Sequence, residues 1–105
     1  MGNDDLKSIG DIDKMIHEPS RLMIMSLLYV VESADFLFIM RQTEMTWGNL
    51  SSHMSKLEAA GYIKVEKEFL ERKPHTILSM TEGGRGAFER YRDDMQKILE
   101  SMGKE

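Results

Sequence analysis

The chain has 105 residues, of which 41% are hydrophobic, and a formal net charge of −4; this suffices for one domain with its own core but not for an added ligand domain. It contains no cysteine, which excludes disulfides, thiolate metal sites and a cysteine nucleophile. The opening residues are too polar for a signal peptide, and no apolar run approaches about 18 residues. We therefore expect a cytoplasmic protein without a membrane span.

Residues 1–17 carry a weak apolar stripe at helical spacing, which Gly10 interrupts. Its members are Leu6, Ile9, Ile12, Met15 and Ile16. This pattern predicts an N-terminal helix. Because the stripe lies outside the part of the chain that forms the central domain, we interpret it as a contact in a dimer.

A second helix is predicted from Glu18 to about Glu32. Pro19 stands at an early helical position, where its missing N–H is tolerated, and an apolar stripe follows at Leu22, Met25, Leu28 and Tyr29. This helix should pack one face against the core.

Residues 34–36 are predicted to form a short strand, and residues 37–42 a short helix. The run from Phe36 to Met40 is apolar throughout, which is too much for one stripe of a short helix. Two interpretations stay open. Either part of the run is exposed or covered by another subunit, or Asp35 caps the helix and the extra side chains fold into the core.

The segment from Thr46 to Ala60 predicts an amphipathic helix. Leu50, Met54 and Leu57 share one face, Thr46 supplies an N-cap hydroxyl, and Gly61 supplies a left-handed stop. The opposite face is small and polar, with Gly48, Ser52, Ser55 and Ala59 at its centre and Asn49, Ser51 and Lys56 on its flanks. Small polar groups let a helix come close to another polar surface.

Residues 62–80 predict a β-hairpin. Ile63, Val65 and Phe69 alternate with charged residues, and a second alternating run covers residues 75–80. Between them, residues 70–74 form a charged turn that contains Pro74, which suits a hairpin tip. Acidic side chains at positions 66, 68 and 71 interrupt the basic character of this hairpin.

Three pieces in this order carry a resemblance: SSHMSKLEAAGYI at residues 51–63, Arg72-Lys73-Pro-x-Thr76, and Thr81-Glu-x-Gly84-Arg85. From about Glu18 to Leu99 the chain resembles small winged-helix transcriptional regulators of the ArsR and MarR type. The resemblance implies a mainly α fold with a small β-hairpin (α+β), in which residues 18–81 are a winged helix-turn-helix module. Residues 46–60 would be the recognition helix, the hairpin the wing, and double-stranded DNA the partner. Leu37 departs from the pattern, because the family commonly has a serine or threonine cap there.

Residues 82–105 predict a C-terminal helix with a long apolar stripe at Phe88, Tyr91, Met95, Ile98 and Met102, broadened by Ala87 and Leu99. Such a stripe needs a partner. We interpret the partner as a terminal helix of a second subunit. A two-fold dimer would place two recognition helices about 34–36 Å apart and bind a pseudo-palindromic operator. The alternative is that both termini pack on their own core.

The candidate DNA-binding residues follow from these positions. They are Trp47, Asn49, Ser51, Ser52, Ser55, Lys56, Arg72 and Lys73. The amide and hydroxyl groups suit base edges and nearby phosphates, whereas Lys56 suits a phosphate and Arg72 and Lys73 suit a minor groove or the backbone. Trp47 has two interpretations: it packs on sugar and phosphate, or it packs against Phe36. Residues 46–81 carry five basic and four acidic side chains, so we expect modest, salt-sensitive affinity.

Other functions are less well supported. The histidines at 17, 53 and 75 are widely spaced, so we expect no metal or cofactor, and His53 is interpreted as a packed side chain. The glycines at 83, 84 and 86 match neither a P-loop nor a dinucleotide fingerprint, so no enzyme is predicted. A winged-helix adaptor that binds a protein through residues 36–40 is the alternative function. The sequence names no small-molecule effector.

Overall fold

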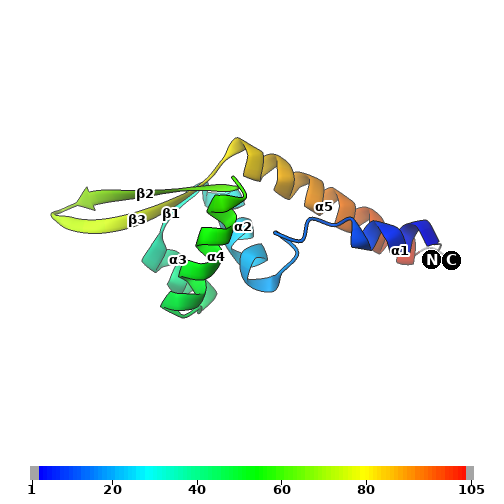
Figure 1. The fold of residues 1–105 in the computed structure, drawn as a ribbon, viewed down its shortest axis with the longest axis horizontal. Coiled ribbons are helices and arrows are strands. Elements are labelled where there is room, and N and C mark those ends of the chain that lie inside the picture. The colour runs from blue at the N-terminus through cyan, green and yellow to red at the C-terminus, as the bar shows by residue number, and fades with distance from the viewer. Residues whose placement is uncertain (1–2, 104–105) are drawn as a thin grey trace.

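The computed structural model describes residues 3–103 and contains five helices and one three-stranded antiparallel sheet (Figure 1). The elements are α1 (Asn3–Gly10), α2 (Pro19–Val31), β1 (Ser33–Asp35), α3 (Phe36–Thr43), α4 (Trp47–Ala59), β2 (Ile63–Leu70), β3 (Lys73–Met80) and α5 (Glu82–Met102). Helices α3 and α4 form the helix-turn-helix, and the β2–β3 hairpin follows as the wing. The predicted fold class is confirmed.

The sheet has the order β1-β3-β2, so the short strand before α3 is confirmed. β1 pairs with residues 77–79 of β3, and β2 pairs with β3 along its whole length. The predicted hairpin tip of five residues is wrong, because only Glu71 and Arg72 separate the two strands. Pro74 lies within β3, where β1 no longer covers the other edge, so its missing N–H breaks no central ladder.

The core lies where α2, α3, α4 and the base of the wing meet. Its fully buried side chains come from each of these elements and from the segment before α2: Ile16, Ile24, Met25, Leu28, Ile39, Leu50, Leu57 and Leu78. The apolar stripes predicted for α2 and α4 therefore face this core. Met54, on the α4 stripe, is partly buried against it.

The prediction of one helix over residues 1–17 is wrong in its extent. α1 ends at Gly10, and the carboxylate of Asp13 accepts hydrogen bonds from the backbone N–H groups of Met15 and Ile16 at 2.9 and 3.3 Å. Such a side chain offers the backbone an alternative to helical bonding. The bend turns Ile12 and Ile16 into the chain's own core, whereas Leu6 and Ile9 on α1 remain exposed.

Both interpretations of the apolar run at residues 36–40 hold in part. The Asp35 carboxylate caps α3 by accepting a hydrogen bond from the Leu37 N–H at 2.7 Å. Phe36 and Ile39 are buried, and Leu37 is 43% exposed. The cap lies two residues before the position at which the family commonly has a serine or threonine.

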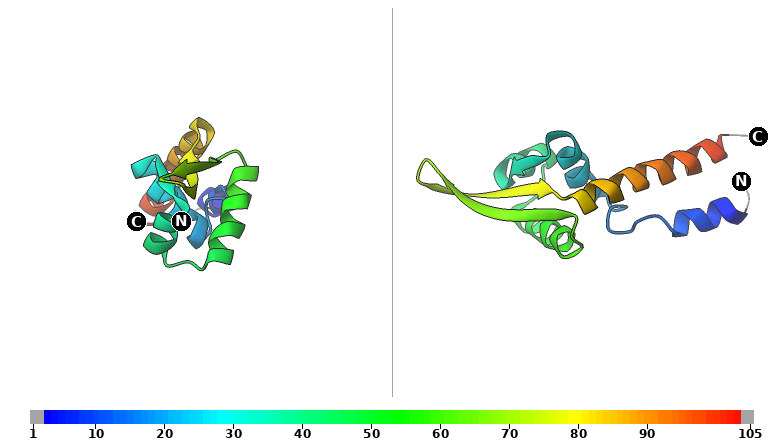
Figure 2. Two further views of the ribbon diagram at one scale, coloured as in Figure 1. Left: turned by 90° about the vertical axis from the view of Figure 1, so that its left-hand side faces the viewer. Right: turned by 90° about the horizontal axis from the view of Figure 1, so that it is seen from above.

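The molecule is elongated, with extents of 59 × 25 × 21 Å. The wing projects at one end, and α1 and α5 lie side by side at the other, where both ends of the chain also lie (Figures 1 and 2). The middle of the molecule holds the core and the helix-turn-helix. The terminal helices and the wing are therefore separate arms.

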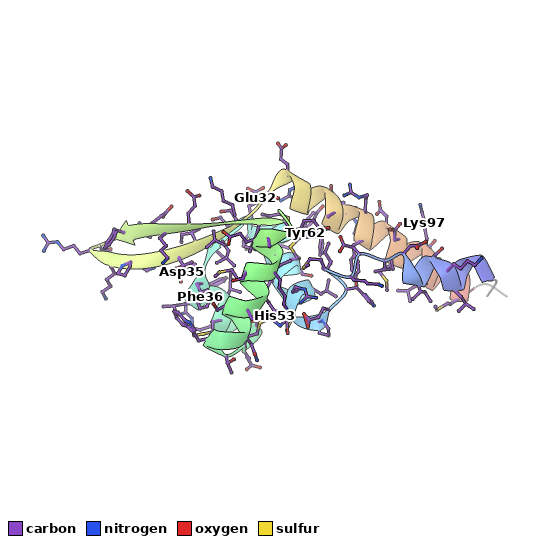
Figure 3. The ribbon with its side chains drawn as sticks, viewed as in Figure 1. Glu32, Asp35, Phe36, His53, Tyr62 and Lys97 are labelled. Atoms are coloured by element: carbon purple, nitrogen blue, oxygen red, sulfur yellow. The ribbon has the colours of Figure 1, made fainter. Side chains whose placement is uncertain are left out.

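The first turn of α5 rests directly on the backbone that joins α4 to β2. Gly61 adopts φ 79°, the Thr81 N–H donates to the Tyr62 carbonyl at 3.1 Å, and the Thr81 hydroxyl donates to the Gly61 carbonyl at 2.7 Å. A Cβ at Gly84 would lie 2.0 Å from the Tyr62 carbonyl oxygen. Only glycine permits this approach (Figure 3, where Tyr62 is labelled).

We predict that Gly84→Ala lowers the free energy of unfolding by about 3 kcal/mol, because the added methyl group meets backbone that cannot move aside cheaply. Gly83→Ala is the matched control. Its Cβ would meet only ordinary contacts at 3.7 Å, so it should leave stability unchanged or raise it by up to about 1 kcal/mol. Urea unfolding followed by circular dichroism measures both. Equal stability of the two variants would contradict the tight contact.

Candidate nucleic-acid interface

Helix α4, which the sequence predicts to be the recognition helix, presents a small polar surface to solvent. Asn49, Ser52, Ser55 and Lys56 are exposed, whereas Ser51 is half-buried. The Thr46 hydroxyl caps the helix by accepting a hydrogen bond from the Asn49 N–H at 3.2 Å. The cap leaves the Asn49 side-chain amide available to a partner. The structure thus brings the predicted α4 residues onto one side of the helix, with Ser51 at its margin.

Gly48 belongs to this surface but is missing from the predicted site residues. A Cβ at Gly48 would have no heavy atom within 4 Å, so nothing inside the protein requires glycine there. A glycine on an exposed helical face lets another molecule approach the backbone closely. Its position on the helical wheel opposite Leu50 was the signal available in the sequence.

Trp47 packs against Phe36, which is one of its two sequence interpretations, and its contact with sugar and phosphate stays a prediction. Its ring packs against Phe36 with centroids 4.6 Å apart, yet 62% of the side chain is exposed. A pocket of about 90 Å³ lies beside it, lined also by Phe36, Pro74 and Thr76. Trp47 therefore lies where the first turn of α4 approaches the wing.

The acidic side chains of β2 lie on one face of the wing. Ile63, Val65 and Leu78 lie on the face that joins the core, and strand alternation puts Lys67 and Phe69 on that same face. The acidic side chains at 66 and 68 lie on the other face, where Glu66 pairs with Lys64 at 3.4 Å. The acidic residues that interrupt the wing in the sequence are thus turned away from the core-side face. Lys67 and Phe69 are further candidate residues that the sequence reasoning missed.

The wing tip is a two-residue turn in a strained conformation. Glu71 and Arg72 both have positive φ, at 52° and 67°. Turns with two such residues favour Asn-Gly, and other residues there cost about 1–2 kcal/mol each. Arg72 and Lys73 are exposed. The predicted site therefore has two separate parts, the α4 surface and the wing tip.

A polar contact holds the wing to the first helix of the helix-turn-helix. The His75 ring N–H donates to the Asp35 carboxylate at 2.6 Å, and the same carboxylate caps α3 (Asp35 is labelled in Figure 3). Burial alone would raise the pKa of Asp35, but the hydrogen bonds from His75 and from the Leu37 N–H outweigh it and lower the pKa below its usual value. The ionised carboxylate thus stabilises both elements.

His53 ties α4 to the start of α2. The Arg21 guanidinium donates to the His53 Nδ1 at 3.1 Å, and its Nε–H donates to the Met15 carbonyl at 2.6 Å. His53 is therefore a packed histidine whose Nδ1 accepts. Burial alone would raise the pKa of Glu18. The hydrogen bonds from the Ser20 and Arg21 N–H groups outweigh burial, so the pKa lies below its usual value.

Over residues 3–103, no three histidine, aspartate or glutamate side chains gather as metal ligands would. Within the same residues, no helix combines the length and apolarity that crossing a membrane requires.

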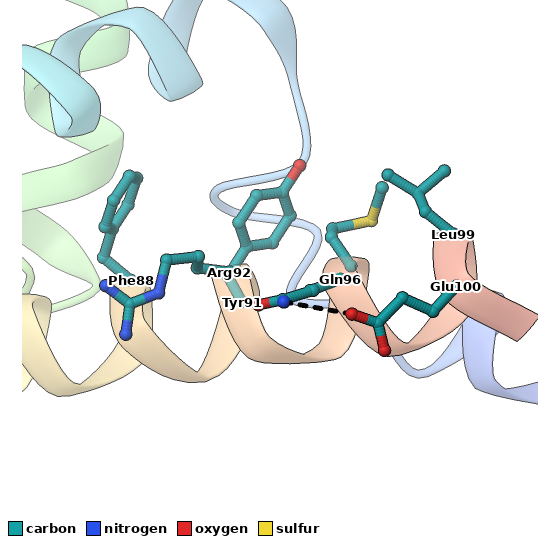
Figure 4. A pocket seen from close by; sticks show the side chains of 7 residues that line it. Phe88, Tyr91, Arg92, Gln96, Leu99 and Glu100 are labelled. Carbon is teal, nitrogen blue, oxygen red and sulfur yellow. Dashed lines mark hydrogen bonds between the residues drawn. The ribbon is translucent and has the colours of Figure 1, made fainter.

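An apolar groove runs along α5 on the arm opposite the wing (Figure 4). It has a volume of about 550 Å³, and its lining residues are Phe88, Tyr91, Arg92, Met95, Gln96, Leu99 and Glu100. Leu99 is 59% exposed, and Met102, one turn further, is 45% exposed. Part of the predicted apolar stripe thus faces solvent in a single chain.

Comparisons with known proteins agree with this geometry. The family model of the winged helix DNA-binding domain matches residues 20–99. An uncharacterized protein of Methanocaldococcus jannaschii is 33% identical over 78 residues, which are 74% of this chain and 85% of that protein. The structure of a transcriptional regulator homologue from Pyrococcus horikoshii OT3 has a TM-score of 0.86 and 29% identity, covering 94% of this chain and 97% of the other. Overoxidized AbfR bound to DNA has a TM-score of 0.69 and 18% identity, covering 90% and 64%, and resembles the chain in fold alone.

We predict that Asp35→Asn destabilises the protein at pH 5.5 by about 1–2 kcal/mol, because it removes a charge-assisted hydrogen bond. The lowered pKa of Asp35 sets the sign: the stabilisation is fully present above the ordinary pKa of about 3.9 and is lost as pH falls through the lower folded pKa. Urea unfolding of both proteins at pH 5.5 and pH 3 should therefore show the difference shrinking at the lower pH. A difference independent of pH would contradict this role.

Proposed function

The chain belongs to the family of winged helix DNA-binding domains, which bears out its resemblance to regulators of the ArsR and MarR type, and we propose that it is a sequence-specific transcriptional regulator acting as a homodimer on double-stranded DNA. One observation carries the proposal. The small polar surface of α4 and the Arg72 and Lys73 side chains of the wing tip are both exposed. A regulator of genes acts where the chromosome lies, so the proposed location is the cytoplasm.

In this proposal α4 enters a major groove, which is wide enough to admit a helix. Asn49 and Ser52 contact base edges, with Asn49 suited to the paired donor and acceptor of an adenine. Ser55 donates to the Ser51 carbonyl at 3.1 Å, so its oxygen remains as an acceptor. Lys56 binds a phosphate, and Gly48 lets the sugar-phosphate backbone pass close to the helix. Trp47 covers sugar and phosphate with its exposed side.

The wing supplies the second contact. Arg72 and Lys73 reach the minor groove or the adjoining backbone, where arginine and lysine side chains are favoured by the negative potential. The strained turn supports this role, because Asn-Gly would form the same turn without strain. Strain kept at an exposed site is typical of a functional residue.

The terminal arms supply the dimer. Residues 18–81 form the proposed reading module, and residues 1–17 and 82–105 the assembly segments. Within them, the exposed Leu6 and Ile9 of α1 and Leu99 and Met102 of α5 are the apolar side chains available to a second subunit. A two-fold axis through this arm would align two α4 helices about 34–36 Å apart on a pseudo-palindromic operator.

The alternative function, a protein-binding adaptor, required an exposed run at residues 36–40. Phe36 and Ile39 are buried, and Leu37 is the member of the run that is exposed. One exposed leucine makes a small apolar patch, well within what ordinary protein surfaces carry. This favours DNA over a protein as the partner.

We predict that selection from a random duplex pool at low salt enriches an inverted repeat with half-sites one helical turn apart. The repeat should persist at moderate salt, because base contacts depend less on ionic strength than phosphate contacts do. Enrichment of nothing would favour the adaptor.

A matched pair of variants tests the dimer in the same selection. Leu99→Glu places a charge in the α5 groove and should give a monomer in sedimentation that enriches single half-sites. Val30→Glu alters an aliphatic side chain that is 78% exposed on α2 and should leave the dimer intact. A dimeric Leu99→Glu variant would contradict assembly through this arm.

We predict opposite effects on stability and binding for Glu71→Asn combined with Arg72→Gly. The new turn adopts positive φ without strain and should raise the free energy of unfolding by about 1 kcal/mol or more. Loss of the Arg72 contact should weaken binding to all sequences and reduce the slope of log affinity against log salt by about 1. Lys64→Ala, on the other face of the wing, is the control. Unchanged affinity and slope in the turn variant would exclude Arg72 from the interface.

A further inference from the structure

The wing tip exposes large apolar side chains where a solvated hairpin would carry polar ones. Phe69 is 78% exposed and Leu70 is 49% exposed. Phe69 lies directly opposite Pro74, whose side chain is also exposed. Edges of sheets are usually protected by charges, since exposed apolar edges favour aggregation. The exposed phenylalanine beside a proline on the projecting hairpin therefore indicates a surface that binds another molecule.

Strand alternation identifies the side of the wing on which Phe69 lies. Ile63 and Val65 precede it at even spacing on β2, and Thr76 and Leu78 follow Pro74 at even spacing along β3. These residues belong to the face that covers the core, below which α3 and α4 lie (Figure 1). Pro74 and Thr76 also line the small pocket beside Trp47. Phe69 thus overhangs the same side as the first turn of α4.

The charged side chains around Phe69 indicate the chemical class of the molecule that binds there. Lys67 shares its face, and Arg72 follows in the turn beside Glu71. Lys73 lies at the tip opposite Leu70, on the other face, which also carries the acidic residues at 66 and 68. A polyanion that also offers an apolar contact matches this arrangement. Nucleic acid has both properties, because stacked bases lie between charged backbones.

Resting on the proposed function, we propose that Phe69 is a wedge that enters the minor groove beside each half-site and partly unstacks one base step. Lys67, Arg72 and Lys73 bind the phosphates on either side, and Pro74 and the tight turn keep the tip rigid. Wedges of this kind bend the duplex toward the major groove. Pyrimidine–purine steps unstack most easily, so the regulator should prefer TA or CA/TG steps at these flanks.

Two substitutions separate this role from a structural one. Phe69 could serve only to stabilise the ribbon through its cross-strand contact with Pro74. Phe69→Thr keeps a residue that favours strands but removes the wedge. Phe69→Leu keeps an apolar wedge, and Leu70→Thr alters the neighbouring side chain on the opposite face.

The experiment uses the full chain and a duplex that carries the selected half-sites, with 2-aminopurine placed in turn at each flanking step and a donor and acceptor dye at the ends. The wild type and Phe69→Leu should raise 2-aminopurine fluorescence at one flanking step per half-site and shorten the end-to-end distance. Phe69→Thr should lose both signals and bind a TA-flanked site about tenfold more weakly, with little loss on an AA-flanked site. Leu70→Thr should behave as the wild type.

The outcomes distinguish the two levels of the proposal. Absence of duplex binding by the wild type would overturn the proposed function itself. Tight binding without fluorescence change, or with a Phe69→Thr variant that matches the wild type, would overturn the wedge alone. An equal loss of affinity on both flanks together with a lower unfolding midpoint would assign Phe69 to ribbon stability and also overturn the wedge.

Discussion

The contact between Gly84 and the Tyr62 backbone is the constraint on which the arrangement of this molecule depends. The end of α4, the start of the wing and the start of α5 meet at this point. This one close approach therefore sets the relative directions of α4, the wing and α5. The Tyr62 hydroxyl also donates to Asp13, which fixes the bend before α2. Burial and the neighbouring Asp13 carboxylate raise the pKa of Tyr62 to about 12, so the hydroxyl stays a donor throughout the physiological range. Helix α4 and the terminal arm are thereby held in a fixed relation by backbone geometry.

Beyond this junction, polar contacts supplement the shared core in orienting the elements that we propose to read DNA. The wing extends past the core, and Asp35 and His75 fasten its base to α3. His53 and Arg21 fasten α4 to α2 in the same way. Polar contacts of this kind have directional geometry, so they fix the orientation of an arm that buries little apolar surface. The arrangement suits a protein whose two contact surfaces, α4 and the wing tip, must meet one rigid partner together.

The sequence predicts the elements that rest on periodicity and fails where geometry departs from it. The stripe of α4 and the alternation of β2 place those elements to within a residue or two, because burial enforces both patterns. The stripe over residues 6–16 misleads, because Ile12 and Ile16 are buried through a bend and not through a continuing helix. The tip is misplaced since Glu71 and Arg72 are residues that rarely adopt positive φ. Contacts such as Arg21 with His53 join positions far apart in the sequence, and no local pattern encodes them.

The net charge is a poor guide to this protein because the electrostatic field that DNA meets is local. At physiological salt, charges further than about 8 Å are largely screened, so a phosphate at the wing tip responds to Glu71, Arg72 and Lys73 and hardly to the acidic residues near α1. Along β2, strand alternation puts Glu66 and Glu68 on one face together with Lys64, and places Lys67 on the other face. A count of charges along the chain therefore hides this difference between the two faces of the wing. In the proposed complex, the acidic remainder of the chain disfavours other orientations on DNA, which would lower non-specific binding and leave recognition to α4 and the wing.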